Sequence, residues 1–319
     1  MSGSDKGVVC CFGRDGLGNR MLTAELACRQ ALVCGKGVHI DWEDEVMKLS
    51  FESLARYFDV DGLVWWRSFD ASVPRSLYPE DRALWNHRSL TCDINEVADP
   101  SGWKSKAYLW SRFAQWRRHY RYKNGRYAFR NGEHLGELLF KHEALLMYCS
   151  VPEREPEHFR HFKISSEFKS GLDAWCEARG LRPAPEVAIH VRHTDKSEAS
   201  LEQLRLALYE QHHWTQDTRV HLATDNAAVI EKMKAWIGDK VTLQYFDLER
   251  ASDPMHLRDE DKTTKEVGLA MALREMLILS KSKEFWYQEA SSFSRVALAL
   301  AGSEQRCFSW TKGVHRQNL

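Results

Sequence analysis

The sequence predicts an α/β protein built from two Rossmann-like domains. Its 319 residues are long for a single compact core, so two domains are the natural expectation. The chain begins with a strand, a glycine-containing turn, a helix and a second strand, and its last third alternates apolar strands with helical segments. Both patterns are typical of parallel sheets whose connecting helices cover the two faces.

The N-terminal half opens with one strand–helix–strand unit, which forms a right-handed parallel crossover. Glycines in its turn let the backbone approach a ligand, and the N-terminus of the following helix attracts anions. Gly16 and Gly18 lack the third glycine of the dinucleotide fingerprint, so a plain tight turn is the default when the pattern is taken alone. The expected elements are a strand at residues 8–12, a loop at 13–20, a helix at 21–31 and a strand at 37–41.

Residues 42–180 are irregular and rich in helical pattern. Asp59-Val-Asp61 and Asp259-Glu-Asp261 match the Asp-X-Asp triplet with which many enzymes hold a divalent metal. Such triplets are common by chance, and both stand in segments predicted as loops, where a solvated turn is the more frequent outcome. We therefore expect no bound metal.

Residues 108–130 are dense in aromatic and basic side chains. Such a mixture could stack on single-stranded nucleic acid. We favour an amphipathic helix followed by a hairpin at Asn124-Gly125, with arginine stems lying along apolar surface. A surface for an anionic or oligosaccharide substrate is the second choice.

The C-terminal half begins after Leu181-Arg-Pro-Ala-Pro185, because its two prolines interrupt any helix. The predicted domains are residues 1–182 and 183–319. Beyond the boundary the alternation of strands and helices predicts a doubly wound parallel sheet. We expect strands at 187–192, 220–223, 241–246 and 284–287 and helices at 201–213, 226–237, 264–282 and 291–302.

The composition excludes several classes of partner. Lys plus Arg number 45 and Asp plus Glu also number 45, so no overall field attracts nucleic acid or membrane. No secretory signal and no apolar run of membrane-spanning length is visible. The 8 cysteines form no Cys-X-X-Cys pair and no zinc spacing, so we expect reduced thiols and a cytoplasmic protein.

The run from Val187 to Lys196 predicts a ligand site. Four of its first five residues are apolar, which indicates a buried strand, and polar side chains follow at once. The carboxyl end of a strand is where open α/β sheets bind ligands. Arginine binds phosphate oxygens in a bidentate way, so this end suits a nucleotide diphosphate-sugar. The polar residues presented together are Arg192, His193, Thr194, Asp195 and Lys196.

Three patches of sequence carry a resemblance to a known family. His190-Val-Arg-His-Thr-Asp-Lys196 resembles the donor motif of the GDP-fucose-dependent α1,6-fucosyltransferases, and the bacterial nodulation enzymes have the same Arg-His pair. The supporting patches are Gly16-Leu-Gly-Asn-Arg20, and Leu222-Ala-Thr-Asp-Asn226 followed by Leu279-Ser280 and Ser291-Ser292. The resemblance implies a GT-B fold and a metal-independent, inverting transfer of fucose from GDP-fucose to a hydroxyl of a glycan or glycoconjugate.

The resemblance also implies roles for individual residues. Arg192 would bind the donor β-phosphate and stabilise the departing GDP. Asp225 and Asn226 stand where the family contacts guanine and ribose, although the family often has two acidic residues there. Glu275 stands four residues before Leu279-Ser280, where the family has an aspartate. Ser291 and Ser292 could hold phosphate oxygens or only cap a helix. The other residues expected at the donor are His190, His193, Asp195 and Lys196.

Inverting transfer needs a base near the acceptor hydroxyl, unless the reaction is dissociative enough to proceed without one. Glu198 and Asp15 are the candidates, and the sequence does not choose between them. For His190, a core histidine satisfied by its neighbours is an equally good interpretation.

If both halves are Rossmann-like, each presents the loop after its first strand at a carboxyl edge. The loop of Gly16, Gly18, Asn19 and Arg20 should then face Arg192 to Glu198 across a cleft. A transferase using another nucleotide sugar, or an inactive sugar- or nucleotide-binding protein, remains the alternative function.

Overall fold

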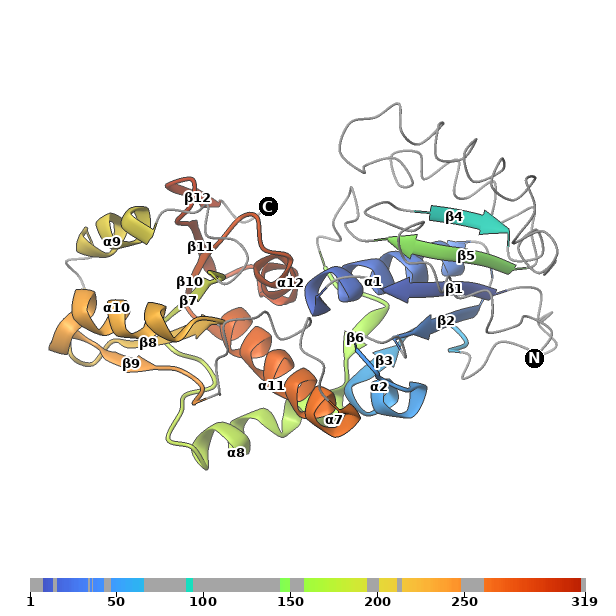
Figure 1. Cartoon of the computed structure of the whole chain (residues 1–319), viewed down its shortest axis with the longest axis horizontal. Helices are drawn as coiled ribbons and strands as arrows, with labels where there is room; N and C mark the ends of the chain where they lie inside the picture. Colours follow the sequence, from blue (N-terminus) through green and yellow to red (C-terminus); the bar gives the residue numbers. More distant parts are fainter. Residues whose placement is uncertain are drawn as a thin grey trace. The chain divides into compact units, whose positions relative to one another are not determined.

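The computed structural model confirms a mixed α/β fold with parallel sheets. The chain divides into two compact units, Met1–Lys163 and Ile164–Leu319, each with its own main sheet (Figure 1). Within the described part no helix is long and apolar enough to span a membrane. The residues described are 8–13, 16–33, 35, 37–42, 47–65, 90–93, 144–149, 158–193, 201–210, 214–247 and 261–316.

The first unit contains a four-stranded sheet in the order β2-β1-β5-β4 (Figure 1). Strands β1 (Val8–Gly13) and β2 (Gly37–Asp41) are parallel, as predicted. The sheet continues through β5 (Ala144–Cys149), parallel to β1, and β4 (Leu90–Asp93), antiparallel to β5. These last two strands were not predicted, because an unbroken apolar run such as Ala-Leu-Leu-Met-Tyr-Cys fits a buried helix as well as a strand.

Helix α1 (Leu17–Val33) begins one turn earlier than the sequence predicted. The Arg20 N–H donates to the Gly16 carbonyl at 3.3 Å, and the Thr23 hydroxyl donates to the Asn19 carbonyl at 2.8 Å. The expected loop at 13–20 is therefore wrong in its second half. Gly18 is tolerated in the first helical turn, where backbone N–H groups have no partner within the helix in any case.

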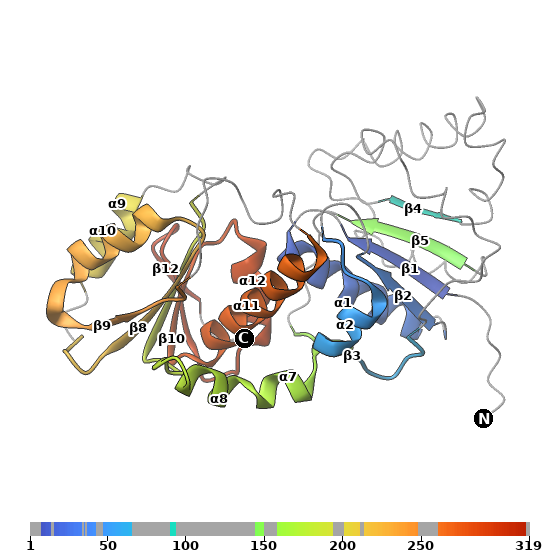
Figure 2. The same cartoon turned by 60° about the horizontal axis from the view of Figure 1, so that its bottom comes forward.

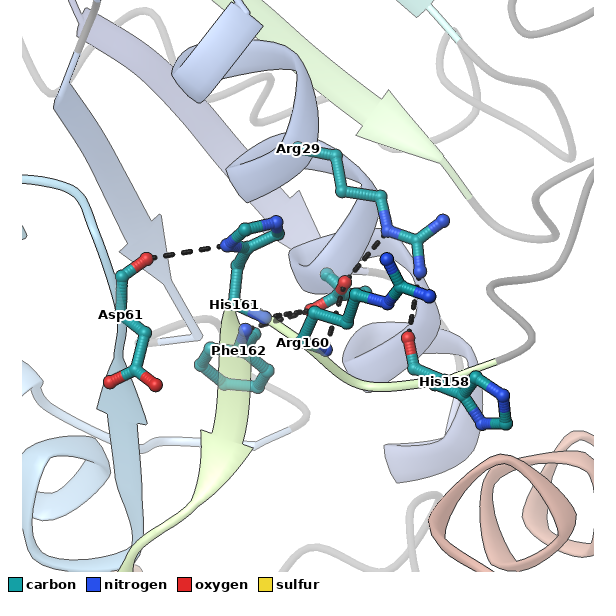
Figure 3. A network of polar contacts seen from close by, with 7 residues as sticks. Arg29, Asp61, His158, Arg160, His161 and Phe162 are labelled. Atoms are coloured by element: carbon teal, nitrogen blue, oxygen red, sulfur yellow. Dashed lines mark hydrogen bonds and ion pairs between the residues drawn. The ribbon is translucent and has the colours of Figure 1, made fainter. Parts of the chain in front are cut away.

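The buried carboxylate of Glu25 clamps the end of this unit to α1. Figure 3 labels its partners Arg29, Arg160, His161 and Phe162. Its side chain is 0% exposed and accepts the N–H groups of Arg160, His161 and Phe162 at 3.2, 2.9 and 2.8 Å. Arg29, one turn further along α1, donates to the same carboxylate at 2.7 Å and to the His158 carbonyl at 2.7 Å. A carboxylate this deeply buried is stable only because its oxygens are fully hydrogen-bonded.

Aromatic side chains fill the space beside this clamp. Helix α2 (Phe51–Tyr57) leads into β3 (Phe58–Val60), which pairs with β6 (Phe162–Ile164) in a small second sheet. The rings of Phe58 and Phe162 stack at 4.5 Å, and Trp42 meets both edge-on at 5.6 and 5.8 Å. Because Phe162 follows the clamped N–H groups directly, the clamp and the aromatic cluster stabilise each other.

The second unit is a doubly wound sheet in the order β12-β11-β10-β7-β8-β9, in which only β12 is antiparallel to its neighbour. Its strands are β7 (Val187–Val191), β8 (Arg219–Thr224), β9 (Thr242–Gln244), β10 (Glu284–Tyr287), β11 (Arg306–Ser309) and β12 (Val314–Arg316). Its helices are α7 (Ser166–Ser170), α8 (Leu172–Glu177), α9 (Leu201–Tyr209), α10 (Ala227–Ile237), α11 (Lys262–Lys281) and α12 (Ser292–Leu300).

Helices cover both faces of this sheet (Figure 2). Ile189 and Val191 belong to the core shared with α9 and α10, whereas Ala188 packs with residues of α11 and α12. Side chains of a strand alternate between the faces, so His190 points to the α12 side. The strand order reverses between β7 and β10, which is the topological switch point where such sheets bind ligands.

The structural boundary precedes the predicted one. Residues 164–182 belong to the second unit, since the Arg274 guanidinium of α11 lies over the rings of Phe168 and Trp175 at 5.0 and 4.6 Å. Gln244 also donates to the Gly180 carbonyl at 3.3 Å. These long-range contacts are invisible in the local pattern. The division into functional domains at 182/183 stays a prediction, and so does a cleft between the two halves.

Candidate functional site at the switch point of the second sheet

Arg192 leaves the sheet at the switch point. It follows the last residue of β7, and its backbone N–H donates to the side-chain oxygen of Gln288 at 2.8 Å. Gln288 in turn follows the last residue of β10. The two carboxyl ends that flank the switch point are therefore joined through these two residues. The half-buried Arg192 is placed where a ligand of this sheet would bind.

The next residue is held from the other neighbouring strand. The His193 N–H donates to Oδ1 of Asp225 at 2.8 Å, and Asp225 follows the end of β8. The predicted residues Arg192, His193 and Asp225 thus lie together at one edge of the sheet, as the carboxyl ends of parallel strands require.

His190 has the contacts of a satisfied core histidine. It is only 6% exposed, its Nδ1 lies 2.7 Å from the Ser294 hydroxyl, and its ring stacks on Phe293 at 4.9 Å. Burial, assisted by the positive charge of Arg192, lowers the pKa of His190 to about 3. The imidazole is therefore neutral near pH 7 and links β7 to α12.

Ser291 stands at the N-cap of α12 but makes no capping hydrogen bond with its side chain. Its hydroxyl oxygen is buried and has no hydrogen-bond partner. A buried polar atom without a partner costs about 1–3 kcal/mol, so such an atom calls for an explanation. Ser292 is the buried first residue of the helix, at the positive end of its dipole. Together the two serines mark a place suited to an anionic group.

Asn226 serves as a helix cap. Its side-chain oxygen accepts the Ala228 N–H at 2.9 Å at the start of α10, and its own N–H donates to the Thr224 hydroxyl at 3.3 Å. This use of the amide favours a local structural role over the predicted contact with a nucleotide base.

The remaining predicted residues lie elsewhere or are not described. Glu275 is half-buried on α11. Gly18, Asn19 and Arg20 lie in the first turn of α1 in the first unit and Gly16 directly precedes the helix; Arg20 is fully buried. Their roles stay predictions. Outside the described residues lie Asp15, Asp195, Lys196, Glu198, Asp259 and the whole segment 108–130.

The Asp-X-Asp triplet at Asp59 does not lie in the predicted loop: Asp59 and Val60 belong to β3, and Asp61 follows directly after the strand, with both aspartates exposed. The Asp61 carboxylate is ion-paired with Lys163, and the Asp61 N–H donates to the His161 carbonyl at 2.8 Å. A carboxylate neutralised by lysine is a poor metal ligand. No cluster of three or more His, Cys, Asp or Glu side chains suited to a metal occurs within the described ranges.

Sequence reasoning missed Gln288 and Ser294. Gln288 is 1% exposed, and its backbone N–H donates to the Ser294 hydroxyl at 3.3 Å. Gln288 could have been found by the rule applied to Arg192, since it also follows directly on a predicted strand. Ser294 carries no such signal, because serine three residues into a helix is ordinary.

Comparison with solved structures shows the same fold over the whole chain. The NodZ α1,6-fucosyltransferase soaked with GDP-fucose is 18% identical, with a TM-score of 0.54 over 97% of both chains. The fucosyltransferase NodZ from Bradyrhizobium is 17% identical, with a TM-score of 0.54 over 98% of both chains. A mutant of Arabidopsis thaliana FUT1 in complex with GDP is 12% identical, with a TM-score of 0.51 over 97% of this chain and 71% of that one.

Comparison of the sequence alone gives no relatives, because no protein-family model and no curated protein matches it. The structural comparisons nonetheless agree with the resemblance in the sequence motifs. This chain therefore has the fold of the solved fucosyltransferases that it matches from end to end.

Proposed function

We propose that this protein is a glycosyltransferase that transfers a sugar from a nucleotide sugar to a hydroxyl of a glycan or glycoconjugate. The proposed donor is GDP-fucose. The proposed reaction inverts the configuration at the anomeric carbon of the sugar and uses no metal. The observation that carries the proposal is the position of Arg192 at the switch point, where Gln288 joins it to the N-terminus of α12 and its buried, unpartnered Ser291 hydroxyl. A fold shared with solved fucosyltransferases over the whole chain supports the choice of donor.

The proposed donor site binds the diphosphate between a cation and a helix N-terminus. Arg192 binds the β-phosphate in a bidentate way, while Ser291 and Ser292 contact phosphate oxygens. Both groups are in place before the reaction, so they stabilise the charge that develops on the leaving GDP without reorganising. Asp225 accepts from the nucleoside, and the side chains of His193, Asp195 and Lys196 complete the site.

In the proposed reaction the acceptor oxygen attacks the anomeric carbon of fucose from the face opposite the phosphate. The bond from that carbon to the β-phosphate oxygen breaks, both electrons leave with GDP, and the acceptor proton goes to a base. Glu198 and Asp15 remain the candidate bases. Gly16, Gly18, Asn19 and Arg20 of the first unit would contribute to the donor or acceptor side.

A cytoplasmic location is part of the proposal. It rests on the cysteines, which the sequence predicts to be reduced thiols of the kind found in a reducing compartment. The cysteines Cys28, Cys176 and Cys307 are buried, as expected of reduced core thiols.

The test is a panel of nucleotide sugars followed by a turnover assay. GDP-fucose held at a hundred times its dissociation constant should raise the free energy of unfolding by about 2.7 kcal/mol. GDP-mannose and UDP-glucose at the same concentration should raise it less. GDP release from GDP-fucose, measured with and without glycan acceptors, then reports activity. Stabilisation by UDP-glucose alone would contradict the donor. Binding of GDP-fucose without any release of GDP across the acceptor panel would favour an inactive binding protein.

A further inference from the structure

Gln288 occupies a special place beside the candidate donor site. It is almost completely buried, and both its side chain and its backbone make hydrogen bonds there. Its side-chain oxygen accepts the Arg192 N–H at 2.8 Å, and its own N–H donates to the Ser294 hydroxyl at 3.3 Å. The Ser294 hydroxyl lies 2.7 Å from Nδ1 of His190. Gln288 thus joins β7, β10 and α12 within one polar network.

This network reaches the backbone N–H of Arg192. Strand β10 pairs with β7 only as far as Trp286 and Ile189, so the sheet itself does not carry β10 alongside Arg192. The Gln288 side chain extends the contact to the point where the chain leaves the sheet. The partly buried Arg192 N–H needs an acceptor. The position of that acceptor constrains the plane of the peptide and hence the direction in which the Cα–Cβ bond of Arg192 leaves the backbone.

We propose that Gln288 is a positioning residue that aims the guanidinium of Arg192 at the terminal phosphate of a nucleoside diphosphate. The inference rests on the proposed function, in which Arg192 binds the β-phosphate. It predicts a selective effect on binding, because a nucleoside monophosphate has no β-phosphate for Arg192 to contact. Loss of the Gln288 oxygen should weaken binding of GDP and leave binding of GMP unchanged.

Gln288→Leu tests this, since leucine stays buried but offers no acceptor. The dissociation constant of GDP, measured by calorimetry, should rise about tenfold, and that of GMP should stay within about twofold. Gln305→Leu is the matched control. Gln305 is also a buried glutamine, bonded to the carbonyls of Leu279 and Ser282, but it precedes β11 and so lies at the opposite edge of the sheet. It should leave both constants unchanged.

A double-mutant cycle separates positioning from general damage. In an Arg192→Ala background, Gln288→Leu should have no further effect on GDP binding, because Gln288 acts through Arg192. If Gln288→Leu weakens GDP and GMP equally, or weakens GDP to the same extent without Arg192, the proposal is overturned. Gln288→Met, with a more adaptable side chain, takes the place of Gln288→Leu if the latter does not fold.

Amide hydrogen exchange tests the contact without any ligand. The Arg192 N–H should exchange faster in Gln288→Leu than in the wild type, whereas Gln288→Glu keeps an acceptor oxygen and should preserve protection. Unchanged exchange in Gln288→Leu overturns the inference. If exchange changes as expected but the wild type binds neither GDP nor GMP, the proposed donor is wrong while the hydrogen bond from Gln288 to Arg192 is supported.

Discussion

Arg192 is the residue on which the proposed chemistry depends most directly. Arg192→Ala should lower turnover of GDP-fucose by about a hundredfold to a thousandfold, the range typical for loss of one group that stabilises the transition state. The free energy of unfolding should change by less than about 1 kcal/mol, since the side chain is half exposed and lies outside the core. Arg192→Lys should restore activity only in part, because lysine lacks the bidentate fork.

The control for this experiment is Arg219→Ala. Arg219 begins β8 and so lies at the amino edge of the same sheet, away from the proposed donor site. Its replacement should leave GDP release unchanged. Wild-type turnover in Arg192→Ala would remove the phosphate-binding role.

His190 predicts a pH dependence of stability. Its pKa is about 3 in the folded protein, against 6.5 for an ordinary histidine. Between these two pH values His190 is protonated in the unfolded chain but stays neutral in the folded protein. The free energy of unfolding should therefore fall as the pH drops from 6.5 towards 3, with a contribution of at most about 1.4 kcal/mol per pH unit. Urea denaturation at several pH values measures it. His190→Asn should show a shallower slope, and an identical slope would contradict the assignment.

At the scale of the helix, two N-cap serines should behave differently. Ser165 accepts the Phe168 N–H at 3.2 Å, so Ser165→Ala should lower the free energy of unfolding by about 1 kcal/mol. Ser291 makes no such bond, so Ser291→Ala should cost less than about 0.5 kcal/mol while it weakens GDP binding. Thermal unfolding and calorimetry on the two variants decide the matter. A large loss of stability in Ser291→Ala, with GDP binding unchanged, would make Ser291 a plain cap.

The clamp between α1 and residues 158–162 predicts a large effect on stability. Glu25→Ala removes the acceptor of three backbone N–H groups and of Arg29, so the first unit should lose about 3–5 kcal/mol of unfolding free energy. Glu202→Ala is the control, because the ion pair of Glu202 with Arg205 is exposed to solvent and should contribute little to stability. Similar losses in the two variants, measured by urea denaturation, would show that the clamp does not stabilise the unit.

For the whole molecule we expect turnover to survive removal of divalent metals. Asp61 is neutralised by Lys163, and the proposed leaving group is stabilised by Arg192 and a helix N-terminus in place of a cation. GDP release in excess EDTA should stay within about twofold of the rate without it. Abolition by EDTA and recovery with Mn²⁺ would establish a metal-dependent mechanism and return attention to Asp59 and Asp61.

Local patterns predicted the second unit better than the first. Strands β7 and β10 were predicted within a residue of their ends, since each is a short apolar run bounded by polar residues. Helix α9 ends at Tyr209 and is followed by a turn at Glu210, while residues 211–213 of the predicted helix lie outside the described residues. Strand β9 is half the predicted length. Ends of elements depend on caps and on neighbouring strands, which a local pattern does not contain.

The sequence by itself determined the α/β class, the ends of β7 and β10 and the position of Arg192 directly after a strand, because these depend on periodicity and on the residue that follows a strand. Only the tertiary structure decided what surrounds Arg192. Gln288 is 96 positions away from it, Ser294 is 104 positions from His190, and Phe162 is 137 from Glu25. Such pairs become neighbours only when crossover connections bring distant strands side by side, and no local pattern specifies which buried polar group will find which partner.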